Sequence, residues 1–256
     1  EEEEAEGEQA PLVMVVDGEA ANDTQRSLDY IRQSPVSGYL NGYTDGFQAQ
    51  GQGLLKLHLE IPLAQDALPK VRGSYRIDGN RLNLGRHIPL LQDVRGELFF
   101  TNDSITATNV SAQILGGPAR FNLRNEGSVL RVHADGTMDA GSLHRADPYA
   151  MLTRLQGETA WQAEVSVHDK LADVQVSSDL LGVSSALPHP FQKKAAQKIG
   201  LRLKMRDIDV GHDSLRLSYG EIFDAALWRE KKEDGHWALR RGNLVLGKAD
   251  KLSDKD

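Results

Sequence analysis

Histidines often carry chemistry, and eight of them occur among the 256 residues, at positions 58, 87, 133, 144, 168, 189, 212 and 236. None forms an HExxH motif or a helical pair suited to zinc. His133-Ala134-Asp135 and His212-Asp213 could each bring an imidazole and a carboxylate together. His58, however, alternates with leucines, which is typical of the polar face of a strand. We therefore expect the histidines to be structural.

Other reactive arrangements are equally absent from the sequence. There is no G-x-S-x-G elbow and no S-x-x-K set, and the chain has no cysteine, which excludes disulfides, thiol chemistry and cysteine-based metal sites. Gly116-Gly117-Pro118 lies between two strand-like runs and predicts a turn or bulge rather than a phosphate loop. We expect no catalytic residue, no metal and no cofactor. Paired carboxylates for glycoside hydrolysis depend on the fold, so that alternative stays open.

The charge is concentrated at one end of the chain. Lys and Arg number 30 and Asp and Glu 37, giving a net charge of −7, and six glutamates with no basic residue fall within the first nine positions. The rest has a net charge of −7 + 6 = −1, which argues against a nucleic-acid partner and against a polybasic membrane surface. We expect a disordered acidic leader over 1–10 and a disordered tail over 248–256. Because the sequence begins with Glu1, we expect an interior segment of a longer protein.

An alternating pattern dominates after Gly51. In Leu55–Ile61 every second residue is apolar, and Leu201–Met205 and Leu215–Tyr219 repeat the pattern. A period of two predicts strands with one buried and one wet face, and turn signals such as Asp78-Gly79-Asn80 separate about a dozen of them. The sequence therefore predicts a mostly β fold of repeated antiparallel hairpins over 51–247.

Short helical segments are expected around these strands. Over 11–50 we expect a short strand at Leu12–Val16 and helices at 23–32 and 35–45, with caps at Asn22, Asp23 and Ser34. Helical insertions are predicted near 143–155 and 190–198. In the second of these, Lys193 and Lys194 follow Phe191, and this positive cluster could meet an anionic head group, although a solvated helix face explains it equally well.

Several phrases resemble those of a known family. Ser177–Val183, followed by Leu187–Lys193, resembles the "SSDLxGL…LPxPFxK" signature of the YhdP-type, AsmA-like envelope proteins of Gram-negative bacteria. Val94–Asn102 with Ala107–Pro118 is similar to a hairpin of that family, and Leu57–Leu63 to its strand ending in "IPL". These pieces occur in the family's order and cover much of 34–205.

The resemblance implies a long, strongly curled antiparallel sheet, a taco-like β-groove with an apolar concave face and a few short helices. It also implies a non-catalytic periplasmic role in phospholipid transport between the inner and outer membranes and in maintaining the outer-membrane permeability barrier. The partners would be phospholipid acyl chains, and an inner-membrane anchor would lie elsewhere in the full-length chain. Lys193 and Lys194 are the head-group candidates, and the candidates for the apolar groove are Leu55, Leu57, Leu59, Ile61, Leu201, Leu203, Leu215 and Leu217.

Other interpretations remain open at this point. Alternation alone is also typical of an ordinary closed core. A carbohydrate-active or carbohydrate-binding β-sandwich would need converging carboxylates or an aromatic row, whereas Trp161, Trp228 and Trp237 are scattered. A purely structural envelope module would present sheet edges that pair with neighbours. A segment of a longer sheet would present the same edges, so copies of it could associate edge to edge.

Overall fold

The computed structural model describes residues 12–33, 46–63, 68–85, 88–146, 150–169, 171–209, 211–234 and 236–247. The expected leader over 1–10, helix over 35–45 and tail over 248–256 lie outside the described residues. One antiparallel sheet of 14 strands dominates the described chain. The prediction of a mostly β chain with one long antiparallel sheet and few helices is confirmed.

The strands follow one another in the sheet almost in sequence order, β1-β3-β4-β5-β6-β7-β8-β10-β11-β13-β14-β15-β16, with β2 paired to β4. The first half consists of β1 (Val13–Asp23), β2 (Gln48–Gln50), β3 (Gln52–Pro62), β4 (Lys70–Asn83), β5 (Leu91–Thr101), β6 (Ile105–Ile114), β7 (Gly117–Glu126) and β8 (Val129–Asp139). The second half consists of β10 (Glu158–His168), β11 (Leu171–Ser178), β13 (Leu201–Asp207), β14 (His212–Tyr219), β15 (Phe223–Lys231) and β16 (Trp237–Leu246). β9 (Leu155–Gln156) and β12 (Ser184–Ser185) form a separate small sheet.

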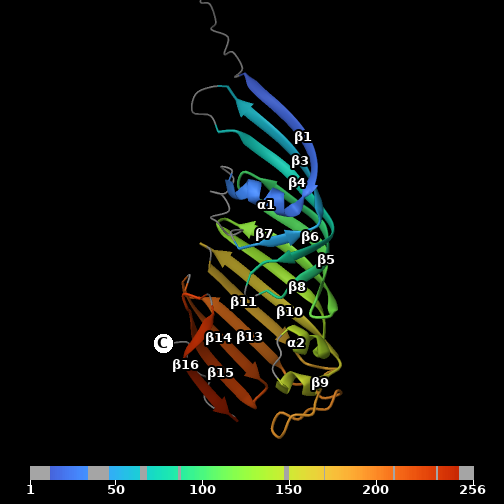
Figure 1. Ribbon diagram of the computed structural model, residues 1–256, viewed down its shortest axis with the longest axis vertical. Helices are drawn as coiled ribbons and strands as arrows, with labels where there is room; N and C mark the ends of the chain where they lie inside the picture. The colour runs from blue at the N-terminus through green and yellow to red at the C-terminus, as the bar shows by residue number, and fades with distance from the viewer. Residues whose placement is uncertain are drawn as a thin grey trace, which may run out of the picture.

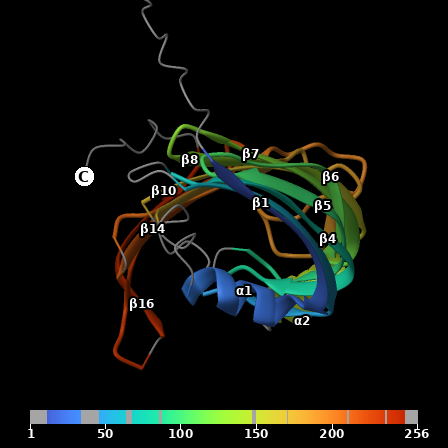
Figure 2. The same ribbon diagram turned by 90° about the horizontal axis from the view of Figure 1, so that it is seen from above.

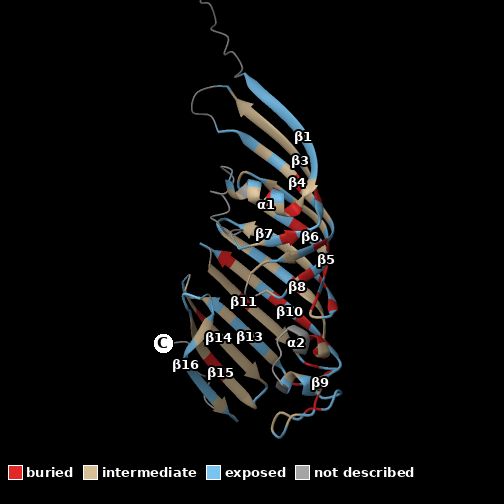
Figure 3. Ribbon diagram, in the orientation of Figure 1, coloured by how far each residue is buried: buried red, intermediate tan, exposed pale blue. Residues whose placement is uncertain are grey.

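The strands stack along the long axis of the molecule (Figure 1). Seen along that axis, the sheet bends round in an arc, and α1 (Thr24–Gln33) and α2 (Ala140–Ala146) lie on the side toward which it bends (Figure 2). Buried residues concentrate in the middle strands, whereas the first and last strands, β1 and β16, are largely exposed (Figure 3). Each of these two end strands pairs with one neighbour in the described sheet.

Helix α1 confirms the helix predicted over 23–32. The Asp23 carboxylate accepts hydrogen bonds from the backbone N–H groups of Gln25 and Arg26, at 2.9 and 3.2 Å. This is the N-cap arrangement that satisfies donors left free in the first helical turn.

The helix predicted over 143–155 is divided into two pieces. The α-helical part, α2, begins at Ala140, and a 3-10 helix, η2 (Ala150–Arg154), follows. Asp139 at the end of β8 caps α2, because its carboxylate accepts the Gly141 N–H at 3.1 Å and the Ser142 hydroxyl at 3.0 Å. A cap on the last residue of a strand starts the helix earlier than the apolar pattern indicates.

The helix predicted over 190–198 is wrong. Lys193 instead forms a β-bridge with Ser185: the Ser185 N–H donates to the Lys193 carbonyl at 2.8 Å, and the Lys193 N–H donates back at 3.1 Å. A residue whose backbone groups are paired across the chain in this way cannot use them for the ladder of a helix. Residues 186–200 therefore form a loop that returns to the start of β13.

The buried core lies on the middle strands. Its centre is formed by Leu91, Val94, Ala112, Ile114, Ala119, Ala134, Trp161 and Ala163. Four of these eight residues are alanines, which suits close packing where the sheet bends. The core therefore stabilises the bend, and the strands at either end of the sheet extend beyond it.

Candidate functional site

One apolar row crosses the sheet from β3 to β15. Successive cross-strand partners along this row are Leu55, Tyr75, Leu98, Ala107, Leu123, Val132, Val165, Val174, Met205, Leu215 and Leu227. We call the sheet face that carries this row the inner face, and the opposite face the outer face. Tyr75 hydrogen-bonds to α1, so the inner face is the side toward which the sheet bends in Figure 2.

All eight leucine and isoleucine candidates point to the inner face. Four lie on β3, two on β13 and two on β14, at positions that share the alternation of the apolar row. Each is intermediate in burial. Seven strands separate β3 from β13 in the sheet. The candidates thus lie on one shared face, toward its two ends. The middle of that face consists of residues that the sequence analysis did not identify as candidates.

Bulges keep the apolar residues on this face through the middle strands. Asp93 in β5 and Asn109 in β6 have left-handed φ angles of 50° and 56°, and the pairing register shifts beside each. In β6, Ala107 and Val110 consequently share the inner face although their separation is odd. Without the extra residue, every side chain beyond it would change faces.

Helix α1 crosses the inner face through polar contacts. The Tyr75 hydroxyl donates to Thr24 at 3.0 Å, and the Asn80 amide donates to the same Thr24 hydroxyl at 2.7 Å. Asn80 is fully buried, and its side-chain oxygen has no hydrogen-bond partner among the described residues. A buried unpaired acceptor costs about 1–3 kcal/mol. Alternation patterns do not reveal this polar patch, because a bulge at Gly79 turns Asn80 inward.

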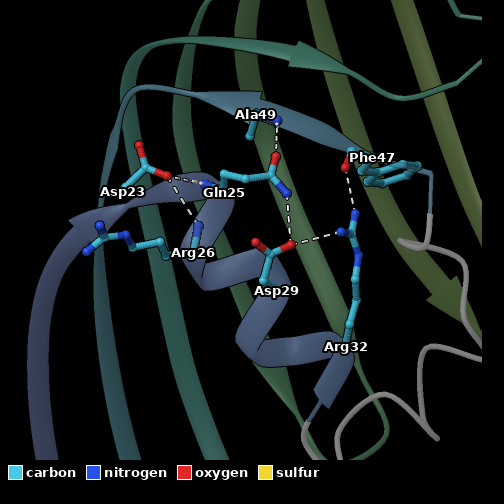
Figure 4. Close-up of polar contacts among 7 residues, drawn as sticks. All are labelled: Asp23, Gln25, Arg26, Asp29, Arg32, Phe47 and Ala49. Carbon is cyan, nitrogen blue, oxygen red and sulfur yellow. Dashed lines mark hydrogen bonds and ion pairs between the residues drawn. The ribbon is translucent and has the colours of Figure 1, made fainter.

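A second set of contacts joins α1 to the segment before β3 (Figure 4). The Gln25 side chain accepts the Ala49 N–H at 2.8 Å and donates to Asp29 at 2.9 Å. Arg32 donates to Asp29 at 2.9 Å and to the Phe47 carbonyl at 2.6 Å. Gln25 in the first turn and Arg32 in the last therefore bond the helix to β2 and to the residue before it, and Asp29 joins these two side chains within the helix.

The loop before β13 covers another part of the inner face. The Phe191 ring lies 6.2 Å from the Tyr219 ring and 5.8 Å from the Phe223 ring, both on inward positions of β14 and β15. Aromatic pairs of this kind stabilise the loop beyond the contribution of the apolar area that they bury. The "LPxPF" part of the sequence signature thus places an aromatic anchor on the inner face.

The two head-group candidates have different environments. Lys193 is 3% exposed, and its ammonium donates to the carbonyls of Leu180, Val183 and Lys194 at 2.6, 2.7 and 3.2 Å. Burial lowers the pKa of Lys193, and the charge of Asp179 opposes that shift. All three ammonium protons are used within the loop, so Lys193 has none to offer a head group. Lys194 is exposed.

The outer face is polar and carries cross-strand ion pairs. His58 lies 2.7 Å from Asp17, His133 lies 2.6 Å from Glu164, and Arg206 lies 2.8 Å from Asp173. Exposed pairs of this kind contribute little to stability, because water and salt screen them. These charged side chains keep the outer face hydrated. Among the described residues, no group of three or more His, Cys, Asp or Glu side chains is arranged to hold a metal ion.

The tryptophans do not share a surface. Trp161 is buried, and its indole donates to the Thr137 carbonyl at 3.1 Å. Arg241 stacks on Trp228 at 4.2 Å on the outer face, and Arg229 lies 5.8 Å from the Trp237 ring on the inner face. This arrangement does not favour a carbohydrate platform, which needs aromatic rings side by side.

The family model described as "YhdP protein" matches residues 8–256. The chain belongs to the YhdP family. A relative, the intermembrane phospholipid transporter YhdP of Escherichia coli (strain K12), is 22% identical over 201 residues. Those residues cover 75% of this chain and 16% of the relative, so the chain spans a small part of the relative's length. No solved structure matches. In the described part of this YhdP-family chain, no helix is long and apolar enough to cross a membrane.

The pairing of His58 leads to a prediction about its titration. Hydrogen bonds to Asp17 and then to Glu60 raise the pKa of His58 above its ordinary value of 6.5. The interaction of the charged imidazole is therefore fully present below pH 6.5 and is lost as the pH rises through the raised pKa. NMR titration of this YhdP-family chain should show His58 titrating above 6.5, with the value falling in Asp17→Asn. An ordinary or lowered value in the unaltered chain would contradict this pairing.

The carbonyl cage around Lys193 predicts a loss of stability on substitution. Lys193→Met removes three charged hydrogen bonds from a buried loop and should lower the free energy of unfolding by about 2–4 kcal/mol. The neighbouring Lys194→Met is the matched control and should change it by less than about 0.5 kcal/mol. Urea unfolding midpoints measure both. Equal midpoints for the two variants would show that the cage does not stabilise the loop.

Close packing on the inner face predicts a second pair of variants. A Cβ atom at Gly73 would collide with the Phe100 ring and with the Lys56 carbonyl. Gly73→Ala should therefore lower the free energy of unfolding by about 1–3 kcal/mol. Gly18 lies in the same cross-strand row and has open space around it, so Gly18→Ala should cost less than about 0.5 kcal/mol. Thermal or urea unfolding would decide, and a tolerated Gly73→Ala would contradict the packing.

Proposed function

We propose that this chain is a non-catalytic segment of a periplasmic protein that carries phospholipids between the inner and outer membranes, and that it thereby supports the outer-membrane permeability barrier. In this proposal the inner face forms a β-groove for acyl chains. The observation that carries it is the unbroken apolar row from Leu55 on β3 to Leu227 on β15. Toward the two ends of this row, the inward leucines of β3, β13 and β14 are only half-buried. Membership of the YhdP family and the name of the relative support the same substrate class.

The energetics of such a groove need no specific pocket. Each methylene removed from water contributes about 0.8 kcal/mol, so an acyl chain resting on half-buried leucines gains several kcal/mol from contact alone. The ion pairs of the outer face oppose binding of a lipid from that side, because their charges would lose water. The two faces therefore differ enough to hold a lipid on one side of the sheet.

The ends of the sheet support the view that the groove is longer than this chain. β1 and β16 each pair on one side in the described sheet, and Val13, Val15, Leu244 and Leu246 on them are exposed. We propose that neighbouring segments of a longer protein extend the sheet at these edges, and that an inner-membrane anchor lies outside this chain. An isolated copy would then tend to associate through the same edges, as exposed strand edges do.

Photocrosslinking in cells tests the proposed groove. A photoreactive amino acid at Leu57 or Leu203 should capture phospholipid, because both side chains lie on the inner face. The adjacent residues Lys56 and Lys204 point to the outer face of the same strands and serve as matched controls that should capture none. Mass spectrometry of the crosslinked protein identifies the product. Capture at the lysines but not at the leucines, or no capture at any inner position, would refute the groove.

A further inference from the structure

Charge is distributed unevenly over the inner face. Among the described strand residues, the inward positions from β1 to β11 carry no Asp, Glu, Lys or Arg. The inward positions of β13, β14 and β15 carry Asp207, Asp213, Arg229 and Lys231. All four lie where β13 ends, β14 begins and β15 ends, and we call this group the charged rim.

A buried ion pair organises the charged rim. The Arg229 guanidinium donates from Nε to Asp213 Oδ1 and from Nη2 to Asp213 Oδ2, both at 2.9 Å. The Asp213 side chain is fully buried, whereas that of Arg229 keeps 28% of its exposure. The Trp237 ring on β16 lies 5.8 Å from the guanidinium and restricts it further. The arginine is thus held in one orientation, and neither bond to Asp213 uses its Nη1 group.

The remaining two charges have different roles. Asp207 accepts the Ala172 N–H at 3.0 Å, just as Asn102 accepts the Val71 N–H and Asn125 the Ile105 N–H at the same edge of the sheet. Asp207 therefore satisfies a backbone N–H at the start of the neighbouring strand β11. Lys231 lies two residues beyond Arg229 on the same face and is exposed. The four formal charges of the rim sum to zero: Arg229 is paired with Asp213, Asp207 is bonded to a backbone N–H, and Lys231 carries the exposed positive charge.

This arrangement fits a phosphate group at the edge of an apolar surface. A fixed guanidinium offers planar N–H donors that match phosphate oxygens, and an ammonium adds charge without geometric demands. Leu215 and Leu227 are the inward residues next to Asp213 and Arg229, one step deeper on the same strands. A molecule with a phosphate at the rim would therefore lay attached acyl chains on leucines.

We propose that Arg229 and Lys231, with Asp213 as a positioning residue, bind the phosphate of a phospholipid whose acyl chains lie on Leu215 and Leu227. This site rests on the proposed function, because it assumes that lipid chains occupy the inner face. It adds to that function a fixed position for the head group.

Native mass spectrometry of the purified chain with three probes tests the site. The probes are phosphatidylglycerol, diacylglycerol with the same acyl chains, and inorganic phosphate. The double variant Arg229→Gln/Asp213→Asn removes both members of the buried pair, so no lone charge is left buried. It should retain about tenfold less phosphatidylglycerol, as expected for losing a charged hydrogen bond, while diacylglycerol retention stays unchanged. Lys231→Gln, at an exposed position, should reduce phosphatidylglycerol retention in the same direction.

Arg206→Gln/Asp173→Asn is the control, since it makes the same two substitutions in an exposed cross-strand Arg–Asp pair on the outer face. It should leave the retention of both lipids unchanged. Phosphatidylglycerol retention that is equal in the unaltered chain and in both rim variants would overturn the site while leaving the groove intact. Retention of neither lipid by the unaltered chain would count against the proposed function itself. Inorganic phosphate bound as tightly as phosphatidylglycerol would overturn the lipid assignment in favour of a soluble phosphate ligand.

Discussion

The structure depends on one constraint: every strand must keep its apolar residues on the same side of a sheet that runs through nearly the whole described chain. Side chains alternate along a strand, so a slip of one residue would place a strand's leucines in water and its charges against the core. The register avoids this even where the alternation in sequence breaks. Asp93 and Asn109 take left-handed conformations that insert one residue and restore the face. The same bulges bend the strands that carry them, and the bend brings the core residues together.

The bend separates two kinds of inner surface. In the middle strands Val94 and Ala134 are almost fully buried, whereas Leu57 and Leu203 toward the two ends of the sheet remain half-buried. A closed sandwich would bury both ends, because leaving leucines partly in water forgoes part of the hydrophobic stabilisation. The protein tolerates this because the core at the bend and the continuous backbone ladder hold the sheet. The stabilising core and the partly open apolar face thus lie on different strands of the same sheet.

Local sequence patterns predicted the strands and the helix that depend on local sequence alone. Strict alternation located β3, β13 and β14 and placed their leucines on one face, and the caps at Asp23 predicted α1. The loop around Lys193 could not be predicted in this way, because a run of lysines and alanines favours a helix until Ser185 pairs with its backbone. The pairing of Asp213 with Arg229 was equally hidden. They are 16 residues apart and meet only because β14 and β15 adopt one particular register.

The same register makes the polar groups at the edge of the inner face differ from one strand to another. Along β4 to β7, the side chains of Asn102 and Asn125 accept backbone N–H groups at this edge. These neutral amides would offer a head group only weak hydrogen bonds. At β13 the equivalent position carries the Asp207 carboxylate, and Arg229 and Lys231 follow on β15. A lipid that slides with its chains on the inner face would meet leucines toward the two ends of the sheet and more deeply buried residues in the middle, while the edge under its head group changes from neutral amides to charged side chains. Differences in the binding of the head group along the proposed groove must then arise at this edge, where the charged rim would hold a phosphate longer than the amides do.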